Sequence, residues 1–383
     1  MNLNTLSAYT IVDVEKIRII DNLLNSKLEV CEKKLMDYDL IDECSPCYDY
    51  CLEEPAKFCP ECGSQYSEEE NFCLECGVKL KDITNISVRD IEITPDLSVL
   101  KTNQLNGFEN ILTQENLDRI CSFNFTMKDF KNIIKDIKLQ VLKTLDAAVK
   151  KNHILLDELP IEDKVLLFSK SFVNVEYKSY GGELGYFEFN RIYVDDRQLP
   201  ALQITTLMHE LSHFLLKEII TRILCELLDC TKTSEIESVA IFILSYTPVN
   251  RLMDEYAAHT VEGRFTLFGY QDYSSFLNIQ KTIDLPAEEI EIIKTIANSF
   301  SNYIKQILES FIDEDLLDQI KTRFKQDILD RPDYANLALE NCKLLNDGGM
   351  IQAIEFVVRD GFMISMDNIE TLKEYKRHLV VEK

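Results

Sequence analysis

Four cysteines near the N-terminus constrain the fold of this chain more than any other feature. They form two Cys-x2-Cys pairs, Cys59 with Cys62 and Cys73 with Cys76, separated by ten residues. Glycine follows each pair, and glycine adopts the positive φ of the tight turn that directs both thiolates at one ion. Two such turns supply four thiolates, the closed tetrahedral ligand set of a structural zinc site. We therefore predict a zinc ion with a structural role.

This arrangement resembles a zinc ribbon, which we place at residues 57–83. Neither lysine nor arginine lies between Cys59 and Cys76, whereas five glutamates do. The whole chain has 41 basic and 66 acidic residues, giving a net charge of −25. Because such a surface repels phosphate backbones, we expect the ribbon to serve structure or protein docking and not nucleic-acid binding.

Residues 1–56 combine an amphipathic helix with further cysteines. Apolar residues recur at helical spacing from Ile17 through Leu28 to Leu35, so we expect a helix that packs on its own chain or contacts a partner protein. We see no signal peptide, so we expect a cytoplasmic protein whose cysteines bind metal or stay reduced. Four irregularly spaced cysteines could form a second structural zinc site or remain an apolar cluster of thiols: Cys31, Cys44, Cys47 and Cys51.

The length of 383 residues predicts two or three domains, and the few residues of glycine (11) and proline (9) favour helices over a turn-dense β fold. We predict a linker with short elements at 84–126, a catalytic domain at 127–270 and a helical region at 271–383. No apolar run reaches the roughly 18 residues that a membrane span requires, so we expect no membrane contact.

The predicted catalytic domain contains the sequence His209-Glu210-Leu211-Ser212-His213, an HExxH pattern. It lies in an apolar helix predicted at 200–228, after a β stretch at 172–177 and a hairpin at 185–195. Residues four apart share one face of a helix, so both imidazoles can reach one zinc ion while Glu210 stands beside its open position.

A third protein ligand is needed, and Glu255 is our candidate. It follows Thr247-Pro248, a pair typical of a helix start, and it shares a helix face with His259 and Glu262. Asp254 and Glu262 are weaker candidates, which we expect on solvated faces of that helix.

The order of hairpin, HExxH helix and Glu-x-x-Ala helix resembles the gluzincin peptidases, in particular the ImmA/IrrE-type metallopeptidases. The resemblance implies an α+β, mainly helical protein with a minimal zincin-like domain. It implies that His209, His213 and Glu255 bind a catalytic zinc and that Glu210 is the general base. It also implies that the second hairpin strand, 192–195, pairs with an extended substrate.

His259 departs from that family, in which an Asp or Asn often stands four residues after the ligand Glu. Three interpretations stay open: His259 orients a ligand, acts in catalysis as a transition-state donor or as an alternative ligand, or simply packs.

These features predict a zinc metallopeptidase that hydrolyses a protein or peptide substrate. The alternative is a non-catalytic zinc-binding module that uses its ribbon as an adaptor for a protein partner.

Overall fold

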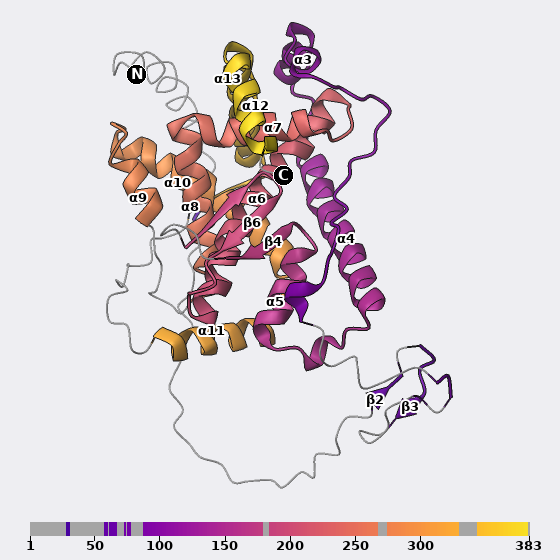
Figure 1. The fold of residues 1–383 in the computed structure, drawn as a ribbon. Coiled ribbons are helices and arrows are strands. Elements are labelled where there is room, and N and C mark those ends of the chain that lie inside the picture. Colours follow the sequence, from indigo (N-terminus) through magenta and orange to yellow (C-terminus); the bar gives the residue numbers. More distant parts are fainter. Residues whose placement is uncertain are drawn as a thin grey trace.

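The computed structural model describes residues 28–30, 57–59, 61–66, 73, 75–77, 87–178, 184–266, 274–328 and 343–381. Over these residues the protein is mainly helical, as predicted, with a small three-stranded sheet and an N-terminal zinc ribbon (Figure 1). None of the described helices is both long enough and apolar enough to cross a membrane.

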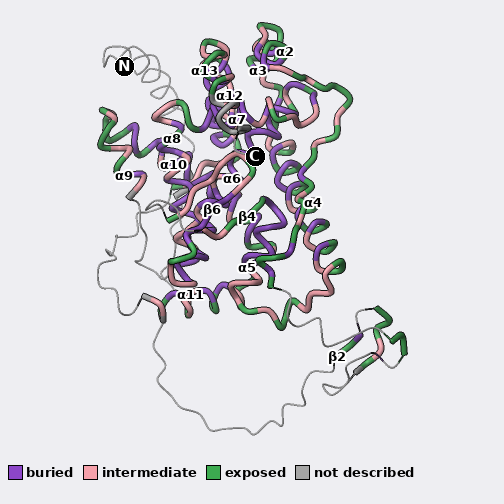
Figure 2. Tube along the Cα trace, viewed as in Figure 1, coloured by how far each residue is buried: buried purple, intermediate pink, exposed green. Residues whose placement is uncertain are grey.

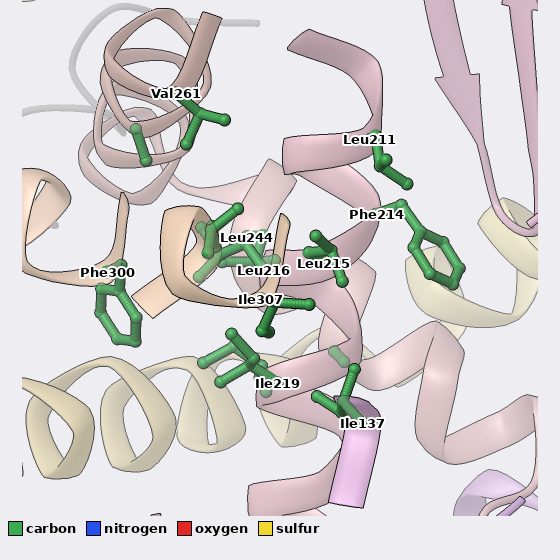
Figure 3. Close-up of a cluster of buried hydrophobic side chains, with 14 of the residues drawn as sticks. Ile137, Leu211, Phe214, Leu215, Leu216, Ile219, Leu244, Val261, Phe300 and Ile307 are labelled. Carbon is green, nitrogen blue, oxygen red and sulfur yellow. The ribbon is translucent and has the colours of Figure 1, made fainter. Parts of the chain in front are cut away.

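Helix α6 (Pro200–Leu228) is the centre of the molecule and has the bounds predicted from the sequence. It is buried along most of its length, because α4 (Met127–Asn152), α7 (Ser234–Tyr246), α8 (Pro248–Glu262) and α10 (Ala287–Leu308) pack around it. Figure 3 shows this core, with α6 side chains meeting those of the surrounding helices. Figure 2 shows the same buried interior and the exposed ribbon.

The remaining elements cover this centre. They are η2 (Val88–Asp90), α2 (Phe108–Ile111), α3 (Gln114–Ser122), η3 (Leu156–Glu158), α5 (Ile161–Lys170), α9 (Ser274–Gln280), α11 (Glu314–Ile328), α12 (Asp347–Asp367) and α13 (Ile369–Val381). Within the predicted linker, 84–126, Val88, Ile111 and Ile120 are buried in the main core, so this segment packs on the helical body.

The small sheet has the strand order β4-β6-β5. Strand β4 (Asn174–Tyr177) runs parallel to β6 (Arg191–Val194), and β5 (Gly185–Glu188) runs antiparallel to it as the predicted hairpin. The prediction that the second hairpin strand accepts substrate is therefore wrong, because β6 is central and pairs on both sides.

Threonine side chains cap both helices that follow α6. Thr247 caps α8 as predicted, and its hydroxyl accepts a hydrogen bond from the Asn250 amide. Ser234 and Glu237 have the spacing of a capping box, but Thr233 caps α7, and Glu237 instead forms ion pairs with two lysines.

The structure corrects one further prediction, near the N-terminus. Leu28–Val30 forms strand β1, paired antiparallel with β7 (Lys343–Leu345), so the predicted N-terminal helix does not continue through Leu28. At the other end, Gly348 and Gly349 lie in the first turn of α12, where the Asn346 side chain accepts from the Gly349 amide. The four cysteines of the possible second zinc site lie outside the described residues.

Candidate metal centre

The ribbon brings its four cysteines together through two tight turns. Gly63 and Gly77 have φ angles of 72° and 71°, the left-handed conformation that the sequence predicted for both turns. Strands β2 (Lys57–Phe58) and β3 (Gln65–Tyr66) pair around the first turn. The four sulfur atoms form one group that can hold a metal ion.

The sulfur geometry fits zinc. Cys59 Sγ lies 3.5 Å from Cys76 Sγ, and Cys62 Sγ lies 3.5 Å from Cys73 Sγ. Sulfurs about 2.3 Å from a tetrahedral zinc ion would lie about 3.8 Å apart. The Ser64 hydroxyl lies 3.1 Å from Cys73 Sγ, and its hydrogen bond lowers the pKa of that thiol to about 6, which favours the thiolate that binds metal.

A second cluster forms where α6 meets α8. The imidazoles of His209 and His213 lie on one face of α6, with Nε2 atoms 3.1 Å apart. The carboxylate of Glu255, on α8, lies with its Oε2 3.8 Å from His209 Nε2. His259 joins them, and ligand atoms of His209, Glu255 and His259 all lie within 4.8 Å of one another.

Two more carboxylates stand behind the imidazoles. Glu262 Oε2 lies 3.1 Å from His209 Nδ1 and 3.2 Å from His259 Nδ1, and Asp254 Oδ2 lies 3.0 Å from His213 Nδ1. The side chains of Asp254 and Glu262 are only 19% and 18% exposed. Their expected place on solvated faces of the helix is therefore wrong.

Glu262 determines which nitrogen of His209 faces the cluster. A carboxylate oxygen only accepts hydrogen bonds, so the Nδ1 atom of His209 carries the hydrogen that it donates to Glu262. His213 Nδ1 lies 3.0 Å from Asp254 Oδ2 as an ion-pair contact without hydrogen-bond geometry. The Nε2 lone pair of His209 therefore faces His213 Nε2 at 3.1 Å, a contact that is favourable with a hydrogen or a metal cation between the two nitrogens. Nitrogens about 2.0–2.1 Å from a tetrahedral zinc ion would lie about 3.3 Å apart, so the donor set fits zinc.

Interactions between imidazoles and carboxylates outweigh burial in setting the pKa values of Glu262, His213 and His209. Burial alone would raise the pKa of Glu262, but hydrogen bonds from His209 and His259 lower it to about 2. Burial would lower the pKa of His213, but the charges of Asp254 and Glu255 raise it to about 10. The pKa of His209 is also raised, since Glu262 outweighs the effect of burial. The cluster therefore favours positive charge at its centre.

Glu210 lies beside this centre and is 7% exposed. Burial raises its pKa, and the nearby carboxylates of Glu255 and Glu262 add to the rise against the opposing imidazoles. Strand β5 approaches closely here: a Cβ built on Gly185 would lie 3.3 Å from Glu210 Cγ and 2.5 Å from Thr206 Cγ2. Only glycine allows the strand to lie this near to Glu210.

Ser275, on α9, also belongs to the cluster, and no sequence pattern predicts its place there. Its hydroxyl donates to Glu255 Oε2 at 2.5 Å, and its Oγ lies 2.6 Å from His259 Nε2. A single serine outside any spaced motif cannot be identified from sequence pattern alone.

Comparisons with known proteins bear on the ribbon. Residues 58–80 match the family model described as a zinc-ribbon domain, which contains all four cysteines of the first site. The chain therefore carries a zinc-ribbon domain. Comparisons with curated proteins and with solved structures find no match. The family match does not include the cluster between α6 and α8, whose character follows from its side chains.

Proposed function

We propose that the protein is a zinc-dependent peptidase whose centre lies between α6 and α8. The observation that carries the proposal is the pair of Nε2 atoms of His209 and His213 at 3.1 Å, with Glu255 beside them and a carboxylate behind each ring. Orienting carboxylates of this kind fix the ring tautomer and strengthen a histidine as a metal ligand.

This proposal gives each residue of the cluster a role. His209, His213 and Glu255 hold the metal, and Glu262 and Asp254 orient the two imidazoles. A zinc ion bound there supplies Lewis-acid polarisation of a carbonyl and acidifies water. Glu210 takes a proton from the attacking water and passes it to the leaving amine, which its raised pKa favours.

The edge of the sheet supports a place for an extended peptide. Strand β5 is at one end of the order β4-β6-β5, and its first residue, Gly185, lies against Thr206 and Glu210. A peptide added alongside β5 by backbone hydrogen bonds would run next to the base.

The variant Glu210→Gln tests the proposal. We expect full-length Glu210→Gln to keep its zinc, since Glu210 is not a ligand, and to lose about a hundredfold or more of its activity. The assay is cleavage of a quenched-fluorescent peptide library, with zinc measured by mass spectrometry. Glu226→Gln, at an exposed position on the same helix, is the matched control and should leave activity unchanged. Cleavage by Glu210→Gln at the parental rate would refute the role of this carboxylate.

A non-catalytic zinc-binding module is the second candidate, because His259 is close enough to complete a closed site. Its ligand atoms lie within 4.8 Å of those of His209 and Glu255. Four protein ligands would leave no position for water, whereas three leave one. The two candidate functions thus differ in whether His259 binds the metal.

A further inference from the structure

Ser275 occupies the space between the proposed ligand Glu255 and His259. Its Oγ lies 2.5 Å from Glu255 Oε2 and 2.6 Å from His259 Nε2. The other ring nitrogen of His259 lies 3.2 Å from Glu262 Oε2. The ring is therefore held at both nitrogens, and its side chain is only 6% exposed.

This arrangement affects the number of protein ligands. His209 Nε2 lies 3.1 Å from His213 Nε2 and 3.8 Å from Glu255 Oε2. Ligand atoms of His209, Glu255 and His259 lie within 4.8 Å of one another, so His259 is near enough to be a further donor. The contact with Ser275 occupies His259 Nε2, while the same hydroxyl holds the carboxylate of Glu255 beside His209. The Ser275 hydroxyl thus contacts both the proposed ligand Glu255 and the additional candidate ligand His259.

We propose that Ser275 is a positioning residue that holds Glu255 in the ligand set and keeps His259 Nε2 out of it. The proposal rests on the metal centre of the proposed function and adds the reason why that centre keeps an open position. Without the hydroxyl, His259 becomes the fourth protein ligand and the site closes.

The test uses cobalt as the probe, with acetohydroxamate as an added ligand that requires an open position. The full chain is loaded with Co²⁺, and the difference in visible absorption with and without acetohydroxamate is titrated. The ribbon site is closed by four thiolates, so the difference spectrum reports the other centre only.

We expect the parental protein and Ser275→Thr, which keeps the hydroxyl, to give a saturable difference spectrum. Ser275→Ala should bind Co²⁺ but lose the response, or need at least about tenfold more acetohydroxamate. The double variant Ser275→Ala with His259→Asn should regain it, because the competing nitrogen is gone. Thr282→Ala, an exposed hydroxyl just after α9, is the matched control and should behave as the parent.

Several results would overturn the proposal. One is a parental response in Ser275→Ala, and another is failure of the double variant to regain the response. A Ser275→Ala protein that no longer binds Co²⁺ at this centre would mean that the hydroxyl does not act through His259. A parental protein with no such cobalt centre would overturn this proposal and the metal centre together. Normal spectra combined with undiminished hydrolysis by Glu210→Gln would instead refute only the catalytic role of Glu210.

Discussion

Glu262 connects two histidines of the cluster. Its carboxylate accepts hydrogen bonds from the Nδ1 atoms of both His209 and His259. Its position three residues after His259 places it one helical turn further along the same face of α8.

Glu262→Gln should weaken the metal centre without removing a ligand. The amide oxygen can still accept a hydrogen bond, but the negative charge that strengthens His209 as a donor is lost, so zinc affinity should fall about 10–100-fold. Competition with a chromophoric chelator measures this. Glu291→Gln, an exposed carboxylate paired with Lys294, is the control and should bind zinc as the parent does. Equal zinc affinity in Glu262→Gln would show that this carboxylate does not support the ligand.

Local sequence patterns predict some residues of the cluster and not others. The HExxH pair and Glu255 follow from helical spacing and a helix start, which are local signals. Asp254 and Glu262 were assigned to solvent because burial depends on which helix packs across α8. Ser275 comes from a separate short helix, and only the tertiary structure brings it to Glu255.

At the scale of the elements, α6 carries both the candidate site and a buried ion network. Glu218 is completely buried, and its carboxylate oxygens lie 2.6 Å from Lys232 Nζ and 2.7 Å from Arg222 Nε. Burial alone would raise the pKa of Glu218, but the charges of Lys232, Lys217 and Arg222 lower it below its ordinary value. This network ties α6 to the segment that leads into α7.

Glu218→Gln should therefore lower the free energy of unfolding by about 3–5 kcal/mol at neutral pH, because buried cations lose their partner. A depressed carboxyl pKa stabilises the fold above the ordinary pKa, and this contribution is lost as the pH falls through the lowered pKa. The difference between the two proteins should thus shrink with acid, which urea unfolding at several pH values measures. Glu226→Gln, 48% exposed on the same helix, should change stability by no more than about 0.5 kcal/mol. A loss equally small for Glu218→Gln would contradict this account of the network.

The helices and the hairpin, whose hydrogen bonds join residues near in sequence, were predicted well. Strand pairs whose partners are distant in the chain were not. The bounds of α6 and the start of α8 follow from apolar periodicity and a Thr-Pro pair. The hairpin of β5 and β6 was visible as two short runs, but the parallel pairing of β4 with β6 has no local signature. The pairing of β1 with β7 joins segments about 300 residues apart in the chain, so no periodicity near Leu28 could reveal it.

Over the whole molecule, two groups of side chains that could hold a metal ion lie in the described residues, and they differ in character. The ribbon has four thiolates in short turns, and its domain family is shown by residues 58–80. The other centre is built from α6, α8 and α9 inside the helical body. The ribbon contacts that body where Glu61 Oε1 lies 3.6 Å from Nε2 of His153, the residue that caps the C-terminus of α4.

If a second zinc ion binds between α6 and α8, the zinc content of the protein will show it. Elemental analysis of the full-length chain should find that the variant with both His209→Ala and His213→Ala holds one zinc ion fewer than the parent. The same variant should retain the zinc that Cys59→Ser with Cys62→Ser removes, so the two losses are independent. Equal zinc content in the parent and the histidine variant, with both proteins folded, would contradict the account.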